Sequence, residues 1–202
     1  MKPIYYLAAV ALLSLETTFV HAAPKKAATK TLQAKPKLIR EVLGTTQLSG
    51  YEGQLKQTFT LGKNSPFNFT LNRVEYSISR VNVGTYAHFP KGDEKMLVLH
   101  LTVQNPRPRV LNFSANYLAI SAVDANGVTR NYIGDIARET TAESVNIALN
   151  PGQKIEAYTA IPVAAFGAVP KLIVRSAYET QAPIVRYDLR GVAQKLAAPY
   201  AD

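Results

Sequence analysis

A period of two in the apolar residues constrains this chain more than any other feature. In "KMLVLHLTVQN" (95–105), the residues on one side of an extended backbone are Leu97, Leu99, Leu101 and Val103. Successive side chains of a β-strand point to opposite faces, so this spacing predicts a strand with one face in a hydrophobic core. His100 has the opposite parity, and we expect it to face solvent.

The same spacing recurs along the chain and predicts further strands. The segments are 55–61, 67–81, 116–123, 128–133, 144–149, 154–163, 171–177 and 183–190. Within 67–81 the apolar parity changes near Asn72-Arg73, which indicates a β-bulge. Turn residues at 124–127 and 150–153 predict two hairpins, because Asn-Gly and Pro-Gly favour tight turns. The second hairpin would pair 144–149 with 154–163.

Seven to nine short strands with frequent turns and no long amphipathic helix predict an all-β, antiparallel sandwich or barrel. The segment "GVAQKLAAP" (191–199) is a candidate for a short terminal helix. The sequence contains no cysteine, which excludes disulfides, a thiolate nucleophile and a zinc-thiolate site. Stability must therefore come from one packed core, and a domain of roughly 150 residues is large enough to form one.

The first residues have the pattern of an export signal. Lys2 supplies a positive start, residues 4–15 form an uncharged apolar run, and Val20-His21-Ala22 resembles a small-residue cleavage site. The apolar run is short compared with the ~20 residues that cross a bilayer. We therefore predict a signal peptide at 1–22, a flexible linker at 23–45, one β-sandwich domain at 46–191 and a C-terminal tail at 192–202. The expected location is periplasmic or extracellular.

The predicted linker contains most of the positive charge. Six Lys and Arg residues against one Glu give residues 23–45 a net charge of +5, of the chain's total of +9. Its mixture of Ala, Lys, Thr and Pro has no periodicity and is typical of a flexible segment. It would act as a solubilising spacer or would contact an anionic cell-wall or outer-membrane surface. The contact residues would then be Lys25, Lys26, Lys30, Lys35 and Lys37.

The order of these elements resembles a known family. "GDEKMLVLHLTVQNP", the "DANGVTRNY" hairpin and "LNPGQKIEAYTAIPVAAFGAVPKLIVRS" are similar to the uncharacterised DUF4352 family and its telokin-like, immunoglobulin-like relatives in exported bacterial proteins. The resemblance covers roughly residues 50–190 and is carried by structural motifs. It implies an immunoglobulin-like β-sandwich, and it implies no activity. The Cys–Trp–Cys arrangement of antibody domains is absent, because the chain has neither residue type.

The sequence offers little for catalysis. It contains no G-x-S-x-G, H-E-x-x-H, P-loop or dinucleotide-binding motif. After removal of the leader only His88 and His100 remain, and Asp135 and Glu139 lie beside Arg138, with which one of them would pair. We therefore expect no catalytic residue, no metal site and no cofactor. A hydrolase with an unrecognised loop site remains an alternative.

A binding or adaptor role is the main functional prediction. Loops on a rigid sandwich commonly carry contact residues, so we expect a protein partner of the cell envelope to bind at the loops around 86–91 and 107–109. The predicted contact residues are Tyr86, His88, Phe89, Lys91, Arg107 and Arg109. A carbohydrate- or cell-wall-polymer-binding module is the alternative, with the aromatic candidates Tyr86, Phe89, Phe113 and Tyr132. Nucleic acid is not expected as a partner, because export separates the protein from it.

Overall fold

The computed structural model describes residues 41–47, 52–179 and 183–196. The predicted signal peptide, the five linker lysines (Lys25, Lys26, Lys30, Lys35 and Lys37) and the last six residues lie outside the described residues.

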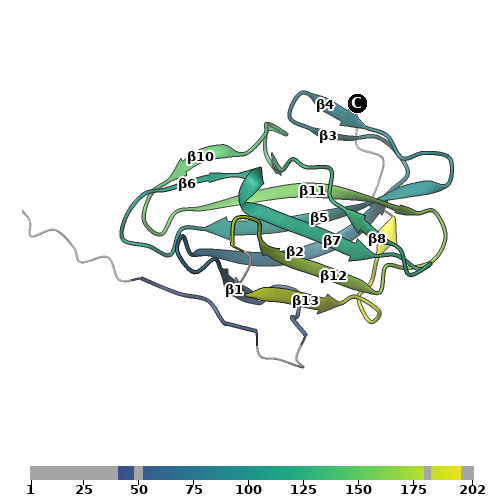
Figure 1. Ribbon diagram of the computed structural model, residues 1–202. Helices are drawn as coiled ribbons and strands as arrows, with labels where there is room; N and C mark the ends of the chain where they lie inside the picture. Colours follow the sequence, from purple (N-terminus) through teal and green to yellow (C-terminus); the bar gives the residue numbers. More distant parts are fainter. Residues whose placement is uncertain (1–40, 48–51, 180–182, 197–202) are drawn as a thin grey trace, which may run out of the picture. The chain divides into compact units, whose positions relative to one another are not determined.

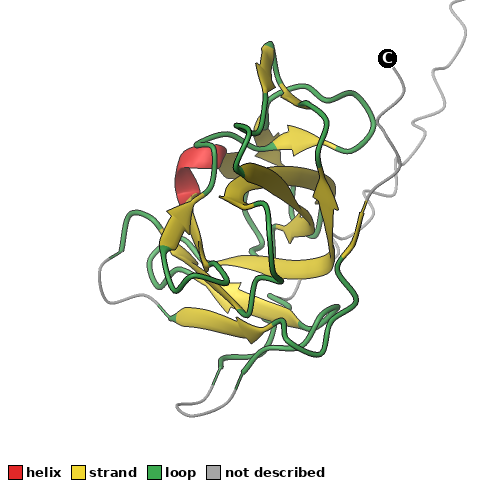
Figure 2. Cartoon of the chain, turned by 90° about the vertical axis from the view of Figure 1, so that its right-hand side faces the viewer, coloured by secondary structure: helices red, strands yellow, loops and turns green. Residues whose placement is uncertain are grey.

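The described chain is built almost entirely from β-strands (Figures 1 and 2). The strands of four or more residues are β1 (Thr58–Leu61), β2 (Phe67–Ser77), β5 (Glu94–Gln104), β6 (Leu111–Ser114), β7 (Leu118–Val123), β10 (Asn146–Leu149), β11 (Lys154–Ala164), β12 (Lys171–Ser176) and β13 (Ile184–Asp188). The shorter strands are β3 (Val81–Val83), β4 (Tyr86–His88), β8 (Thr129–Asn131), β9 (Ala137–Arg138) and β14 (Lys195–Leu196). In the described ranges the one helical element is the 3₁₀ turn η1 (Ala115–Tyr117), so none of them holds a helix long enough to cross a membrane.

The strands form two main sheets. The first, here called the main sheet, has the order β1-β2-β5-β11-β9, with β14 pairing beside β2. The second sheet has the order β13-β12-β7-β8, and two strand pairs, β10-β6 and β3-β4, accompany them. The pairings between named strands are antiparallel except that of β14 with β2. The predicted antiparallel β-sandwich is confirmed.

The core lies where period-two spacing places it. Leu97, Leu99, Leu101 and Val103 of β5 are at most 1% exposed and belong to one large hydrophobic cluster. Residues from β7, β12 and β13 join the same cluster, so the two sheets share one core. The predicted bulge is also present, because the register of β2 against β5 shifts between Leu71 and Arg73.

A second hydrophobic cluster covers the other face of the main sheet, which we call the outer face. It contains Val81 and Val83 of β3, Met96 and Val98 of β5, Ala137, Tyr158 and Ala160. Period-two spacing assigns this face of β5 and β11 to solvent. The β3–β4 hairpin covers it instead, so part of the main sheet is buried on both sides.

The two predicted hairpins have different outcomes. The hairpin at 124–127 is confirmed: β7 pairs with β8, and the Asp124 carboxylate accepts hydrogen bonds from the backbone N–H groups of Asn126 and Val128, both at 2.9 Å. The predicted pairing of 144–149 with 154–163 is wrong. β10 pairs with β6, whereas β11 pairs with β5 and β9.

Asn105 explains why the Pro-Gly turn does not close a hairpin. Its backbone N–H donates to Gln153 O and its carbonyl accepts from Gly152 N–H, both at 2.9 Å, while its side-chain amide donates to Leu149 O at 2.9 Å. The turn is therefore bonded to the end of β5. It carries the chain from the β6–β10 pair to the main sheet.

Residues 191–196 do not form the predicted helix. Lys195 and Leu196 pair in parallel with Glu75 and Tyr76 of β2. The side-chain amide of Gln194 donates to the carbonyls of Val169 and Leu189, both at 2.9 Å, and these bonds hold the segment extended. The remainder of the candidate helix, 197–199, lies outside the described residues.

Candidate functional site

A cleft of about 630 Å³ lies beside the β3–β4 hairpin and opens to solvent. This volume falls in the range of small-ligand sites, about 300–1,000 Å³. Its walls come from β4, η1, the loop before β9 and the start of β10. The lining residues are Tyr86, His88, Ser114, Ala115, Asn116, Ile133, Gly134, Asp135, Ser144, Val145 and Asn146. We call it the hairpin cleft.

Apolar packing, a backbone hydrogen bond and a close contact hold the β3–β4 hairpin, which forms one wall of the cleft. Val81 and Val83 are buried against the outer face of the main sheet. At the tip, Gly84 has φ +62°, and its N–H donates to Ala142 O at 2.7 Å. A Cβ on Gly84 would lie 2.1 Å from the hydroxyl of Ser144, so only glycine allows this approach. The hairpin and the segment at Ser144 therefore pack in one arrangement.

Asp135 organises the base of the hairpin cleft. Its carboxylate accepts a hydrogen bond from the Ser144 hydroxyl at 2.5 Å and another from Ile136 N–H at 2.7 Å. Its backbone carbonyl accepts from the Thr159 hydroxyl, at 2.6 Å, which ties the loop to β11. Each carboxylate oxygen thus accepts one hydrogen bond from the protein.

Other side chains of the hairpin cleft remain available. Asn116, at η1, and Asn146, at the start of β10, are exposed, and no hydrogen bond from either side-chain amide is present in the described part of the chain. The Tyr86 side chain is 68% exposed. His88 is half-buried, and among residues 41–47, 52–179 and 183–196 its Nε2 finds no hydrogen-bond partner although that atom is buried.

The hairpin cleft contains the three residue types of a nucleophilic triad, but not their arrangement. In a Ser-His-Asp triad the imidazole lies between the hydroxyl and the carboxylate and accepts the hydroxyl proton. Here Ser144 donates directly to Asp135. The hydroxyl is therefore bonded to the carboxylate itself, an arrangement that holds the loop in place.

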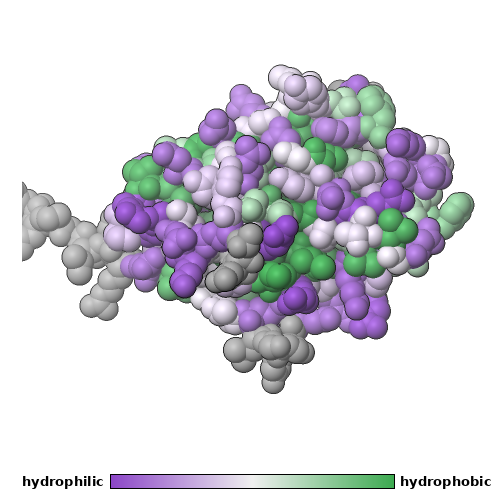
Figure 3. All heavy atoms as spheres, in the orientation of Figure 1, coloured by the Kyte–Doolittle hydropathy of each residue, from purple (hydrophilic) through white to green (hydrophobic). Residues whose placement is uncertain are grey.

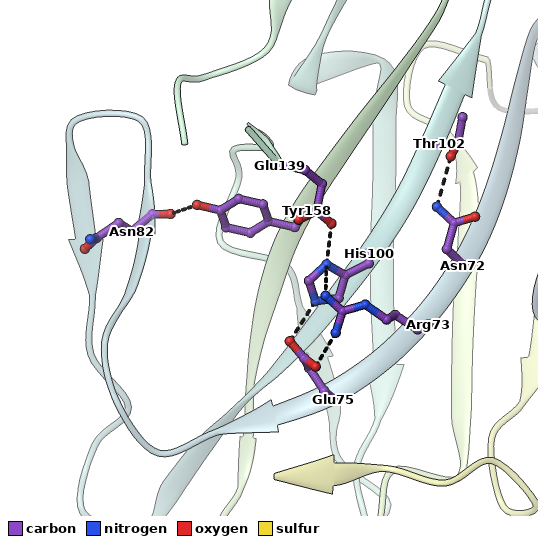
Figure 4. A network of polar contacts seen from close by, with 8 residues as sticks. All are labelled: Asn72, Arg73, Glu75, Asn82, His100, Thr102, Glu139 and Tyr158. Carbon is purple, nitrogen blue, oxygen red and sulfur yellow. Dashed lines mark hydrogen bonds and ion pairs between the residues drawn. The ribbon is translucent and has the colours of Figure 1, made fainter. Parts of the chain in front are cut away.

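The prediction that His100 faces solvent is wrong. Its exposed fraction is 3%. Its Nε2 lies 2.8 Å from Glu75 Oε1, its Nδ1 contacts the Glu139 carboxylate, and Arg73 pairs with Glu75 (Figure 4). Glu139 was expected to be a possible partner of Arg138, and it bonds to His100 instead. The outer-face layer formed by the β3–β4 hairpin and residues 133–142 explains the burial.

Tyr158 links this polar network to the hairpin. Its ring lies beside His100, with centroids 6.2 Å apart, and its hydroxyl donates to Asn82 O at 2.5 Å (Figure 4). Burial, with a smaller contribution from the negative charge of Glu139, raises the pKa of Tyr158. The hydroxyl therefore stays protonated at neutral pH and remains a donor. No group of three or more His, Cys, Asp or Glu side chains in the described ranges is arranged to hold a metal ion.

The predicted contact residues do not gather at one place. Tyr86 and His88 line the hairpin cleft, and Phe89 and Lys91 are exposed in the loop before β5. Phe89 and Lys91 precede β5, an 11-residue strand, whereas Arg107 and Arg109 follow its other end and do not line the hairpin cleft. Arg107 is only 8% exposed, whereas Arg109 is exposed.

The aromatic candidates divide in a similar way. Tyr86 and Phe89 are each 68% exposed, but Phe113 is a core residue at 1%. Tyr132 is half-buried and donates to Leu118 O at 3.0 Å. Sequence reasoning missed Asn116 and Asn146, because a single polar residue near a strand end gives no signal of a site until distant segments are brought together.

Comparisons with known proteins concern the fold alone. No protein-family model matches the chain, so membership of the DUF4352 family is not supported, and no curated protein matches its sequence. An uncharacterised β-sandwich protein from Clostridium difficile 630 is 14% identical, with a TM-score of 0.46 over 78% of this chain and 98% of that one. The secreted protein MPT63 from Mycobacterium tuberculosis is 11% identical, with a TM-score of 0.41 over 69% and 99%. The putative lipoprotein YcdA from Bacillus subtilis is 10% identical, with a TM-score of 0.45 over 67% of this chain and 39% of that one.

Proposed function

We propose that this protein is an exported, non-catalytic binding domain of the bacterial envelope, and that its ligand occupies the hairpin cleft. One observation carries the proposal. Hydrogen bonds tie the backbone segments around the hairpin cleft to one another, while Tyr86, Asn116 and Asn146 present exposed side chains to it. A site of this kind binds without large rearrangement, because its walls are already in place.

The arrangement of polar groups favours binding over turnover. A Ser-His-Asp triad places an imidazole between the hydroxyl and the carboxylate, whereas the Ser144 hydroxyl donates directly to the Asp135 carboxylate, which is also held by the Ile136 N–H. These contacts hold the loop before β9 against the segment at Ser144 and so fix the base of the hairpin cleft. Export is proposed from the leader-like residues 1–22.

A second candidate function is a protein adaptor that uses one end of the sandwich. Phe166, in the β11–β12 loop, is 89% exposed, and Phe89 is 68% exposed. Their loops are joined, because Ala165 N–H donates to Asp93 O at 2.9 Å and the Lys95 ammonium donates to Gly167 O at 2.6 Å. Exposed aromatic side chains at neighbouring loops are frequent anchors of protein interfaces. The face drawn in Figure 3 mixes hydrophilic and hydrophobic residues. A contact of the basic linker with anionic wall polymers would add to either function.

Hydrogen–deuterium exchange of the purified exported protein, with and without solubilised envelope material, tests the proposal. We expect slower exchange in residues 81–88, 114–116 and 133–146. Tyr86→Ala should abolish this protection, whereas Tyr178→Ala should retain it, because Tyr178 is similarly exposed at 64% but does not line the hairpin cleft. Protection confined to the loops of Phe89 and Phe166 would favour the adaptor function. No protection in either region would contradict both.

A further inference from the structure

The hairpin cleft has a composition that selects a chemical class of ligand. We infer that it binds an uncharged glycan segment, an inference that rests on the proposed function. Three features of the hairpin cleft support it: the charge of the lining, the exposed side-chain amides and the exposed aromatic ring.

The lining is unsuited to charged ligands. None of its residues is Lys or Arg. Anionic polymers such as nucleic acids, polyphosphates and teichoic acids bind chiefly through such cations. The single charged group, Asp135, keeps its negative charge while it accepts from Ser144 and Ile136, so the lining repels anions. One carboxylate without a second acidic neighbour in the lining is a weak site for a cation, and neutral ligands are therefore favoured.

The available polar groups match hydroxyl-rich molecules. A side-chain amide presents a donor and an acceptor side by side, and a hydroxyl group can both donate and accept. Asn116 and Asn146 offer two such amides, from different elements of the fold.

Tyr86 supplies the apolar part of the contact. A sugar ring has a face of C–H groups that packs against an aromatic ring, and aromatic side chains contribute large contact areas at low entropic cost. The Tyr86 side chain is 68% exposed while it lines the hairpin cleft. An exposed aromatic ring, two exposed amides and a lining without Lys or Arg together suit a neutral oligosaccharide.

An extended peptide is the main competing ligand. Peptides commonly bind by adding a strand to a sheet edge, where backbone hydrogen bonds supply affinity. Two strands line the hairpin cleft, β4 and β10, and each pairs with one named strand only, so each keeps one edge. These strands are three and four residues long, and an added peptide strand would make few backbone hydrogen bonds with edges so short. The observations therefore favour the glycan, and a peptide becomes an outcome of the test.

The test is an array of neutral oligosaccharides followed by an NMR titration of the labelled protein with the best glycan. We expect saturable shifts of amide signals in 84–88, 114–116 and 144–146. Tyr86→Ala and Asn116→Ala should each weaken binding about tenfold or more, while Tyr86→Phe should retain most of it, because the ring rather than the hydroxyl makes the contact. Tyr178→Ala is the matched control and should bind as the wild type does. Unchanged melting temperatures would show that the variants remain folded.

The outcomes separate this inference from the proposed function. Absence of binding to every neutral glycan, or shifts confined to other surfaces, would overturn the inference. So would binding at the hairpin cleft by polyphosphate or by an extended peptide alone. If envelope material still protects the hairpin cleft in hydrogen exchange, the binding function stands with a different ligand class. If it does not, both fail.

Discussion

The Tyr158 hydroxyl donates to the backbone carbonyl of Asn82 at 2.5 Å, and this bond joins β11 of the main sheet to the β3–β4 hairpin. The two residues are 76 positions apart. The bond fixes one wall of the hairpin cleft to the sandwich, so the shape of the proposed site depends on a residue outside it.

Tyr158→Phe removes that bond while it keeps the ring among Val81, Val83 and Val98. We expect a loss of about 1–2 kcal/mol in the free energy of unfolding, because the Asn82 carbonyl loses its donor. Urea denaturation measures the loss, and hydrogen exchange should show faster opening of 81–88 than of the core of β5. Equal acceleration in both regions would contradict a local role for the bond.

Gly84→Ala tests the close approach to Ser144. Alanine at this position would have to adopt a positive φ of 62°, and its Cβ would lie only 2.1 Å from the Ser144 hydroxyl. Gly127→Ala is the matched control, since it has φ +78° and no neighbouring atom within 4 Å. The control should lose about 1 kcal/mol from backbone strain, and Gly84→Ala should lose clearly more in the same denaturation experiment. Adding Ser144→Gly to Gly84→Ala should recover part of the difference. A loss no greater than that of the control would rule out the collision.

Glu179 makes stability depend on pH. Partial burial acts to raise its pKa, but the backbone N–H groups of Lys63, Asn64 and Ser65 and the charge of Lys63 outweigh burial, so the pKa lies below its ordinary value. A depressed pKa in the folded state stabilises the protein above the unfolded-state pKa, and this stabilisation is lost as the pH falls through the folded-state value.

Glu179→Gln should therefore destabilise the protein at pH 7 and progressively less as the solution is acidified below about pH 4. Melting temperatures of wild type and variant between pH 2.5 and 7 measure the difference. The matched control is Glu156→Gln, an exposed glutamate whose side chain makes no hydrogen bond in the described ranges. A Glu179→Gln effect that does not change with pH would exclude this linkage.

His100→Leu tests the network on the outer face. The replacement leaves the Glu75 and Glu139 carboxylates without the ring nitrogens they contact. Removing one member of a buried polar network lowers the free energy of unfolding by several kcal/mol when the remaining charges stay buried. Both carboxylates here are partly exposed, so we expect a smaller loss of about 2–3 kcal/mol. Urea denaturation gives the value, with Thr102→Val, the next outward residue of β5, as the comparison, since it removes a single neutral hydrogen bond from the Asn72 amide. Wild-type stability of His100→Leu would show that the network contributes nothing.

The sequence by itself determined the long strands β2, β5 and β11, their inward faces and the class of fold, whereas it predicted a loop where β4 lies and no strand at β6. Leu97, Leu99 and Leu101 enter the core because alternation along a strand is a local property of the backbone, and the parity change at Leu71–Arg73 appears as a bulge for the same reason.

Tertiary structure alone decided what covers each face and which segments meet. His100 is buried because the β3–β4 hairpin folds over the outer face, and β10 pairs with β6 because Asn105 holds the Pro-Gly turn at the end of β5. Tyr86, Asn116 and Asn146 share the hairpin cleft although 60 positions separate the first from the last. The alternation of apolar residues predicts which face of a strand a side chain lies on. It does not predict which distant segment covers that face, because that depends on how the whole chain buries its apolar surface.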